Sequence, residues 1–357
     1  MKTTTVLLTG AGAPGAAGIL KSLHGMDDRK VRVVGVDMDP DAYGFAFTDE
    51  QYVVPAGDAT DYVPRLETIA KREQPDVILP LTTNELQPLA THRDRFEQPI
   101  MVSPAEALRA ANDKANLYQF LANRDFDSAP DFHRVESKTA FLDALEDLGY
   151  PEQPVCFKPP VSSGMRGFRI LDERTDRLDR LLETKPGTPI TTADEILPVL
   201  SAADSFPPLV VMEYLPGDEY SVDVLAMGES VGPVVPRTRS RTRAGITFEG
   251  TVEENEDLID AAGSICRELG LEYNINLQFK YDGSGTPKVI EINPRVSGTI
   301  VMCVGAGVNL PALGVKYALG EPVPPQEIKW GTEMVRYWSE LFTMPDGETF
   351  QLPALRR

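Results

Sequence analysis

The sequence predicts an α/β domain followed by an α+β domain, and three observations support this prediction. Strand and helix patterns alternate over residues 1–111, which is typical of a parallel sheet covered by helices. From residue 112 onward, a helix is followed by strands with long glycine-bearing loops, which is typical of an α+β arrangement. The length of 357 residues allows about two or three domains, each with its own core.

In the first domain, the hydrophobic patterns predict five strands and four helices. We expect strands at 5–9, 31–36, 51–54, 76–81 and 99–102, and helices at 15–24, 61–73, 84–92 and 104–110. The polar residues from Thr82 to Glu85 follow the fourth strand, at the end where parallel sheets expose a ligand crevice. The alternative is that Thr83 or Asn84 only caps the next helix.

A glycine fingerprint follows the first strand. Gly10, Gly12 and Gly15 have G-x-G-x-x-G spacing, and Asp37 and Asp39 end the second strand, where a ribose-binding carboxylate is expected. The pattern predicts a Rossmann-like turn, and dinucleotide binding is one interpretation. The other is that the glycines serve the tight turn and the close packing of a helix on its strand, in a sheet without a cofactor.

Composition argues against several classes of function. The net charge of −19 repels nucleic acid and anionic lipid, so a phosphate-bearing ligand requires a local basic cluster. No apolar run approaches the length of a membrane span, and the first residues lack a leader pattern. The distant cysteines Cys156, Cys266 and Cys303 predict buried free thiols, and the three isolated histidines argue against histidine catalysis. We expect a cytoplasmic protein with no nucleic-acid or membrane partner.

The most informative segment is "YNINLQFKYDGSGTPKVIEINPRVSG", residues 273–298. Its first half alternates polar and apolar residues as a strand does, and "DGSG" predicts a hairpin turn. Gln278 then lies near Glu291 and Asn293 across the strand pair. Carboxylate and amide oxygens suit Mg²⁺. The alternative is a polar edge hairpin in which Asn293 is a turn residue.

"IEINPR" after such a hairpin resembles the ATP-grasp superfamily, in particular the carbamoyl phosphate synthase large-subunit type, over most of the chain. The resemblance implies a Rossmann-like (pre-ATP-grasp) domain at 1–111 and a two-part ATP-grasp domain at 112–330 with a hinge near 213–219. A C-terminal segment, 331–357, would pack on the ATP-grasp domain. The implied metal ligands are Gln278, Glu291 and Asn293, holding two Mg²⁺ ions, with Mn²⁺ as an alternative. Arg295 would contact the transferring phosphate or the acyl phosphate.

The segment "VCFKPPVSSGMRGFRIL" predicts two strands joined by a small-residue loop that includes Ser163 and Gly164, with Lys158 near the end of the first strand. Backbone N–H groups in such a loop cradle phosphates while a lysine neutralises them. The alternative is an ordinary β-hairpin. By resemblance, Lys158 and Lys114 hold the phosphates of ATP.

"LVVMEYLPGDEYSVDVL" resembles the hinge of the family. By resemblance, Glu213, Tyr214 and Leu215 offer main-chain groups to the adenine edge, and Glu219 accepts the ribose hydroxyls. A backbone contact needs only a fixed strand end, so the side chain of Glu219 matters most. The alternative for Glu219 is a solvated carboxylate at the start of a strand.

Four arginines alternate in "PRTRSRTRAG", and on a strand all four would share one face: Arg237, Arg239, Arg241 and Arg243. Like charges side by side require anions or acidic side chains opposite them. Either the face is solvated and ion-paired, or Arg241 and Arg243 hold the γ-phosphate or a carboxylate substrate through bidentate contacts.

The resemblance implies an ATP-dependent ligase, in which a small-molecule carboxylate is phosphorylated and then attacked by an amine or similar nucleophile. In such proteins the glycine loop lies near the acceptor substrate, and a homodimer is favoured. The rivals are an enzyme that phosphorylates bicarbonate or carbamate, an NAD(P)-dependent oxidoreductase, and a nucleotide-binding module without turnover. The sequence names neither the carboxylate nor the nucleophile.

Overall fold

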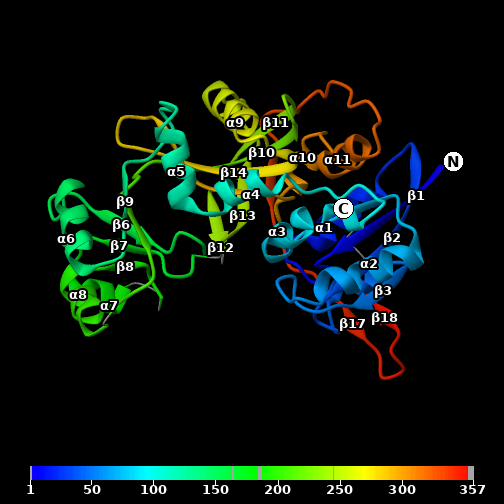
Figure 1. The fold of residues 1–357 in the computed structure, drawn as a ribbon, viewed down its shortest axis with the longest axis horizontal. Helices are drawn as coiled ribbons and strands as arrows, with labels where there is room; N and C mark the ends of the chain where they lie inside the picture. The colour runs from blue at the N-terminus through cyan, green and yellow to red at the C-terminus, as the bar shows by residue number, and fades with distance from the viewer. Residues whose placement is uncertain (1, 163–164, 184–186, 204, 244, 353–357) are drawn as a thin grey trace. The chain divides into compact units, whose positions relative to one another are not determined.

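The computed structural model describes residues 2–162, 165–183, 187–203, 205–243 and 245–352 (Figure 1). The chain divides into two compact units, and each is described by itself. Unit 1 comprises Met1–Leu108, Tyr220–Leu277 and Asn293–Arg357, and unit 2 comprises Arg109–Glu219 and Gln278–Ile292. Among the described residues, no helix has both the length and the apolar character that crossing a membrane would require.

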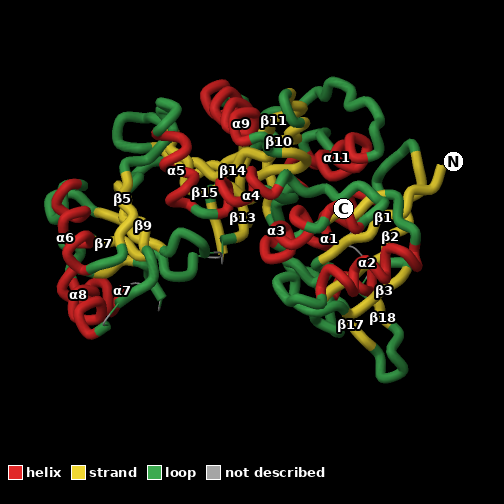
Figure 2. The backbone as a smooth tube through the Cα atoms, in the orientation of Figure 1, coloured by secondary structure: helices red, strands yellow, loops and turns green. Residues whose placement is uncertain are grey.

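The N-terminal part of unit 1 is built around a parallel sheet with the strand order β3-β2-β1-β4. Apolar runs form its strands, so that Val6 on β1 lies between Val33 and Val77 and all three are fully buried. Figure 2 shows strands and helices alternating in this part of the chain. The strands are β1 (Lys2–Thr9), β2 (Arg29–Asp37), β3 (Glu50–Val53) and β4 (Val77–Leu79), and the helices are α1 (Ala16–His24), η1 (Tyr43–Phe47), α2 (Tyr62–Glu73), α3 (Thr83–Thr91), η2 (Arg93–Arg95) and α4 (Ala105–Asn112).

The predicted alternation of strands and helices in this part is confirmed, with one exception. The strand expected at 99–102 is reduced to a single parallel bridge between Ile78 and Ile100. The edge of the sheet is continued there by two hydrogen bonds, from Ile78 N to Pro99 O and from Met101 N to Ile78 O, each 2.9 Å long. Pro99 has no N–H to donate to a longer ladder, which limits pairing at this point.

The later segments of unit 1 add further strands and helices. A four-stranded sheet has the order β11-β10-β14-β15, and a three-stranded sheet has the order β12-β13-β16. Helix α9 begins after the N-cap Asn255 and ends before the C-cap Gly270, whose φ of 65° lies in the left-handed region. The elements are β10 (Glu219–Met227), β11 (Ser230–Thr238), β12 (Arg241–Arg243), β13 (Ile246–Thr251), α9 (Glu256–Leu269), β14 (Glu272–Tyr281), β15 (Pro287–Asn293), α10 (Val301–Gly305), α11 (Leu310–Ala318), β16 (Glu333–Val335), β17 (Phe342–Thr343) and β18 (Thr349–Phe350). Of these, β14 runs on into unit 2, and β15 belongs to unit 2 except for Asn293.

Unit 2 contains a five-stranded sheet with the order β5-β9-β6-β7-β8. Helices α6 and α8 pack against it, and Phe141 on α6 meets Phe157 on β6 edge-on, with ring centroids 5.4 Å apart (Figure 1). The elements are α5 (Lys114–Ala122), β5 (Phe132–Val135), α6 (Lys138–Asp147), β6 (Val155–Lys158), β7 (Arg169–Leu171), α7 (Arg177–Glu183), β8 (Ile190–Thr191), α8 (Ala193–Ala202) and β9 (Leu209–Glu213).

The expected domains are consecutive ranges of the chain, whereas the two units are each assembled from separated segments. Strands β14 and β15 are divided between the units, after Leu277 and after Ile292. The expected division at 1–111, 112–330 and 331–357 therefore describes the order of sequence segments, and it stays a prediction. Within unit 1, β16 pairs with β13, which brings the beginning of the last segment against the small sheet.

Candidate functional site

Two buried lysines of unit 2 converge on strand β15. Lys114 begins α5 and Lys158 ends β6, and their exposed fractions are 6% and 7%. Lys158 Nζ donates to the carbonyl oxygen of Ile290 over 3.0 Å, and Lys114 Nζ lies 3.5 Å from Glu291 Oε2. Three of the residues predicted from the sequence, Lys114, Lys158 and Glu291, are thus brought together around one strand.

The environment of Lys158 disfavours its charged form. Burial, and after it the neighbouring cation Lys114, lower the pKa of Lys158 from 10.5 to about 7, while Glu291 and Glu219 act in the opposite direction. The amine is therefore divided between its neutral and charged forms near neutral pH. An anion close to Lys158 would favour the charged form.

The phosphate loop predicted between β6 and β7 is only partly described. Ser163 and Gly164 lie outside the described residues. The preceding residues are fastened to α5, because Lys114 N donates to Pro160 O over 3.0 Å and Lys114 Nζ donates to Ser162 O over 3.1 Å. Lys114 therefore positions the start of this loop as well as facing Glu291.

Tyr118 is a residue of this site that sequence reasoning missed. Its hydroxyl donates to Ile290 O over 2.7 Å, and Lys158 Nζ lies 5.5 Å from the centre of its ring. The side chain is fully buried, and burial raises the pKa of Tyr118, so it stays protonated and donates. One signal was available, because Tyr118 follows Lys114 by four residues and so shares its face of the helix.

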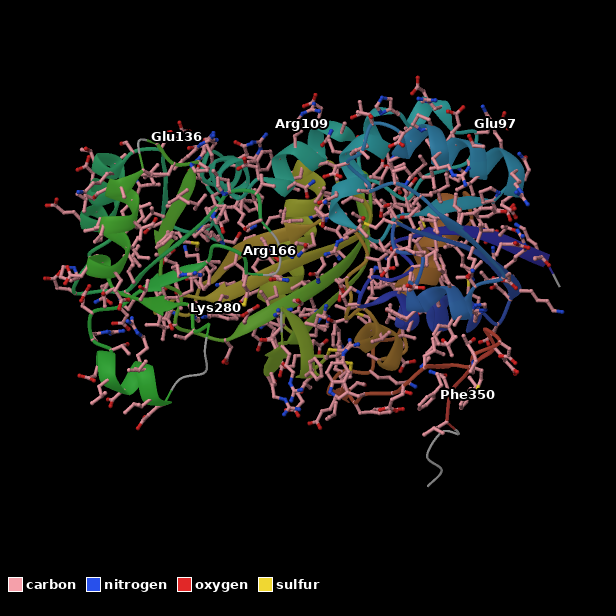
Figure 3. The ribbon with its side chains drawn as sticks, turned by 90° about the horizontal axis from the view of Figure 1, so that it is seen from below. Glu97, Arg109, Glu136, Arg166, Lys280 and Phe350 are labelled. Atoms are coloured by element: carbon pink, nitrogen blue, oxygen red, sulfur yellow. The ribbon has the colours of Figure 1, made fainter. Side chains whose placement is uncertain are left out.

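The hinge residues predicted from the sequence adjoin one another in unit 2. Glu213 ends β9, and its side chain accepts a 3.0 Å hydrogen bond from Asp131 N, while burial raises its pKa. Lys280, labelled in Figure 3, has its Nζ 5.2 Å from the centre of the Tyr214 ring. Leu215 is buried, and Glu219 at the start of β10 is half-buried and near enough to Lys158 to raise its pKa.

The hinge is fixed by main-chain bonds to the end of β14. Gly217 N donates to Tyr281 O over 2.9 Å, and Tyr281 N donates to Asp218 O over 3.1 Å. A Cβ on Gly217 would lie 2.6 Å from Tyr281 Cβ, so only glycine fits this close approach. The segment that was expected to present backbone groups to adenine therefore has a defined position within unit 2.

The three oxygen ligands predicted for Mg²⁺ lie on β14 and β15, which are neighbours in one sheet. Gln278, Glu291 and Asn293 are all half-buried. Among the described residues there is no group of three or more histidine, cysteine or acidic side chains that could hold a metal. One carboxylate with two amides remains a set of hard oxygen donors that fits Mg²⁺ rather than a transition metal.

Arg295 lies in unit 1, close to the end of β4. Its Nε donates to Thr83 Oγ1 over 3.3 Å, and its two terminal nitrogens donate to Val296 O and Asn293 Oδ1 over 2.9 and 3.4 Å. Thr82 caps α3 and forms a capping box with Glu85, so the cap is Thr82 and not Thr83 or Asn84, as the alternative had it. Thr83, in contrast, is in contact with Arg295.

The arginines expected on one strand face are divided by the structure, and that expectation is wrong. The chain leaves the ladder at Arg239 and Ser240, between β11 and β12, which ends the two-residue alternation. Arg237 is buried, whereas Arg241 and Arg243 are exposed. Arg241 pairs with Glu249 at 2.5 Å, and the Arg243 guanidinium lies 4.9 Å from the centre of the Phe248 ring.

The glycine fingerprint serves packing in unit 1. Asp37 Oδ2 accepts a 2.7 Å hydrogen bond from Gly12 N, so this carboxylate is bound to the loop itself. A Cβ on Gly15 would lie 2.4 Å from Gly298 Cα, and one on Gly44 would lie 2.0 Å from Ala11 O. Of the three fingerprint glycines, Gly15 is required by distant backbone, Gly10 has a φ of 64° in the left-handed region, and a Cβ on Gly12 would lie 3.2 Å from Ala42 Cβ.

Comparisons with known proteins agree with this architecture. Residues 205–339 match a family model described as ATP-grasp in the biosynthetic pathway with Ter operon, and residues 6–102 match the PylC-like N-terminal domain. The carbamoyl phosphate synthase large chain of Methanothermobacter thermautotrophicus is 26% identical over 262 residues, which is 71% of this chain and 24% of the relative. The chain thus spans about a quarter of the length of the curated relatives it matches.

Solved structures share the fold at low identity. N5-carboxyaminoimidazole synthetase from Staphylococcus aureus, complexed with ADP, has a TM-score of 0.68 at 16% identity, covering 92% of this chain and 81% of that chain. An L-amino acid ligase from Bacillus licheniformis has a TM-score of 0.62 at 15% identity, with coverages of 89% and 74%. Sequence matches and fold therefore agree: the chain combines a PylC-like N-terminal domain, matched over residues 6–102, with an ATP-grasp domain, matched over residues 205–339.

Proposed function

We propose that the protein is an ATP-dependent ligase that activates a substrate carboxylate as an acyl phosphate. The observation that carries the proposal is the convergence of Lys114 and Lys158 on Glu291 within unit 2. In a chain with a net charge of −19, two buried lysines beside one carboxylate form the local basic cluster that a nucleotide phosphate requires.

The nucleotide is assigned to unit 2. Lys114 and Lys158 neutralise its phosphates, and Glu213, Tyr214 and Leu215 offer main-chain groups to the adenine edge. Glu219 accepts the ribose hydroxyls. The loop that includes Ser163 and Gly164 completes the phosphate contacts through backbone N–H groups.

Gln278, Glu291 and Asn293 are the residues that would hold two Mg²⁺ ions, or Mn²⁺ in their place. When bound, such ions neutralise the charge that develops during phosphoryl transfer. Lys114 is the present partner of Glu291, so this lysine orients the carboxylate before nucleotide binding. If Lys114 paired with a phosphate instead, the carboxylate of Glu291 would be available to bind a metal ion.

The acceptor carboxylate is assigned to unit 1. Arg295 contacts the activated carboxyl group, and its bond to Thr83 Oγ1 fixes the guanidinium at the end of the parallel sheet. Arg241 and Arg243 are assigned to the γ-phosphate or to substrate. Both are exposed, so contact with a ligand would exchange Glu249 and Phe248 for the new partner.

The second substrate is proposed to be an amine, with a thiol as the alternative nucleophile, so that the products are an amide or thioester, ADP and phosphate. The fold shared with an L-amino acid ligase supports the amine. Phosphorylation of bicarbonate or carbamate is the second candidate, and the sequence match to carbamoyl phosphate synthase large chains supports it. The proposal includes a homodimer, which rests on the resemblance to the ATP-grasp superfamily alone.

A thermal-shift series tests the nucleotide assignment. Mg·ATP is expected to raise the melting temperature and NADH is expected to leave it unchanged, because only a ligand bound by the native state stabilises it. A screen of pooled carboxylates and amines for ADP release, with mass spectrometry of the product, then tests the reaction. Stabilisation by NADH alone would contradict the proposal and favour an oxidoreductase.

A further inference from the structure

A second group of cationic side chains lies in unit 1, and the proposed function uses neither of its two central arginines. Arg237 is buried, with 1% of its side chain exposed, and its Nε donates to Asp223 Oδ2 over 2.7 Å. Its Nη2 donates to Ser297 Oγ over 3.1 Å. Its Nη1 is buried and has no hydrogen-bond partner among the described residues. A buried N–H without an acceptor is unfavourable, so this atom can gain an acceptor oxygen from a ligand.

Arg336 reaches the same short segment from the end of β16. Its Nη2 donates to Gly298 O and its Nε to Thr247 O, each over 3.3 Å. Both acceptors are backbone carbonyls, and no carboxylate of the described residues forms an ion pair with this guanidinium. Burial lowers the pKa of Arg336, and the charge of Arg237 lowers it further, which places the two cations within electrostatic range of each other.

The backbone around these arginines is tightly fixed. Gly15 of the glycine loop meets Gly298 so closely that a Cβ would lie 2.4 Å from its Cα. Tyr43 OH donates to Ala13 O over 2.5 Å, and the charge of Arg336 acts on this hydroxyl. Arg237 and Arg336 thus bind adjacent residues, Ser297 and Gly298, beside the loop assigned to the acceptor.

The distance between Arg336 and Arg295 limits the size of the ligand. Arg295 Nη1 donates to Val296 O over 2.9 Å, and Arg336 Nη2 donates to Gly298 O. Two residues of chain span at most about 7 Å, so the carbonyls that hold these guanidiniums are close together. Anions bound at the two places can therefore belong to one small molecule.

We infer that Arg336 and Arg237 form a second anion subsite, and that the carboxylate substrate carries a second negatively charged group that binds there. The inference rests on the proposed ligase function and names the class of its substrate, a small dicarboxylate or acidic amino acid. Arg295 receives the carboxylate that is activated, and Arg336 receives the other through a guanidinium fork. A monoamide of the same length would leave Arg336 without a carboxylate, while Arg237 would keep its ion pair with Asp223.

The first experiment compares succinate and glutarate with their monoamides, succinamate and glutaramate. ADP release is measured with Mg·ATP and hydroxylamine, which converts an acyl phosphate into a hydroxamate and phosphate. The wild type is expected to prefer the dicarboxylates in kcat/KM by about 10- to 100-fold, as loss of a charge-assisted contact implies. Arg336→Gln is expected to reduce this preference to near unity, while Arg72→Gln, at an exposed arginine of α2, keeps it.

The second experiment measures binding without nucleotide, so the subsite and the ligase function fail separately. Calorimetry is expected to detect succinate binding to the wild type, and at least tenfold weaker binding to Arg336→Gln at equal ionic strength. Turnover of the monoamides that equals turnover of the dicarboxylates would overturn the inference and leave the ligase standing. Arg336-dependent binding of succinate with no ADP release from any carboxylate would support the subsite and contradict the ligase.

Discussion

Lys114 and Glu291 form an ion pair across unit 2, with 3.5 Å between Lys114 Nζ and Glu291 Oε2. The lysine begins α5 and the carboxylate lies on β15, so the pair joins a helix to the strand that carries the proposed metal ligand. The lysine side chain is 7% exposed and the glutamate side chain 29% exposed. Loss of the glutamate charge would therefore leave a buried lysine without this partner.

Glu291→Gln should lower turnover by about 10² to 10³, because it keeps the shape but removes a charge positioned for the transfer step. It should also raise the Mg²⁺ concentration needed for half-maximal activity. ADP release against Mg²⁺ concentration measures both effects. Arg295→Ala is the control, since it should slow turnover without changing the Mg²⁺ requirement. Wild-type Mg²⁺ dependence in Glu291→Gln would show that this carboxylate is no metal ligand.

Lys158→Met should weaken Mg·ATP binding by about 10- to 100-fold, as loss of one charge-assisted phosphate contact implies. The same variant should be more stable than the wild type at pH 7, by about 1 to 3 kcal/mol, because a charge in a buried place disfavours folding. Calorimetric titration measures the first effect and thermal unfolding measures the second. Unchanged affinity would remove Lys158 from the nucleotide site.

The pH dependence of stability provides a separate test of Lys158. Its pKa is about 7 in the folded protein and 10.5 for an ordinary lysine, so the unfolded state binds more protons between these values. Its contribution therefore makes stability rise with pH from about 7 toward 10.5. Lys158→Met should lack this rise, measured as the difference in unfolding free energy between the two proteins. A constant difference across that range would contradict the low pKa.

Glu321→Gln should destabilise unit 1 by about 1.5 to 3 kcal/mol at pH 7, because it removes one of the two charged partners, Asp28 and Glu321, of a buried arginine. Arg29 Nη2 donates to Glu321 Oε2 over 2.5 Å, and this bond lowers the pKa of Glu321. A lowered carboxyl pKa contributes stability above the unfolded value of about 4.3 and loses it as the pH falls through the folded value. The difference from wild type should therefore shrink below about pH 4. Glu97→Gln, at an exposed glutamate labelled in Figure 3, should change stability at neither pH.

Gly15→Ala should destabilise unit 1 by about 1 to 3 kcal/mol and impair the acceptor site, because its Cβ would meet the backbone of Gly298. Gly263→Ala is the matched control within α9, where the new Cβ would meet only Arg267 Nη1 at 3.7 Å. That change should raise stability by about 0.5 to 1 kcal/mol, as alanine does inside a helix. Equal melting temperatures for the two variants would contradict the close approach.

The sequence predicted those parts of the fold whose cause is local. The apolar run at Val6–Leu8 predicted a central strand, and the "DGSG" turn predicted the hairpin between β14 and β15. Lys158 and Glu291 stand in recognisable motifs, and the structure brings Lys114 to both. Lys158 and Glu291 were predictable because each lies at the end or in the middle of a strand with a strong pattern.

The remaining features depend on distant backbone. The hydroxyl of Tyr118 donates to a main-chain carbonyl of β15. Every residue has such a carbonyl, so the amino-acid sequence does not reveal which one is the acceptor. The alternating arginines fitted the pattern of a single strand, yet the chain leaves the ladder at Arg239. The Nη2 of Arg239 donates to Gly245 O over 2.9 Å. The glycine fingerprint was ambiguous for the same reason, since the segments that press on Gly12 and Gly15 come from other parts of unit 1.

The acceptor shared by Tyr118 and Lys158 also has a consequence for the order of events during synthesis. The carbonyl of Ile290 follows Tyr118 by 172 residues and Lys158 by 132. While the ribosome is still translating the intervening chain, α5 and β6 have no partner for these side chains, and Lys158 stays hydrated and charged. Such distant pairing carries the entropic cost of closing a long loop. The nascent chain therefore cannot form the lysine cluster proposed to bind phosphate until β15 has left the ribosome, which makes this cluster one of the last parts of unit 2 to mature.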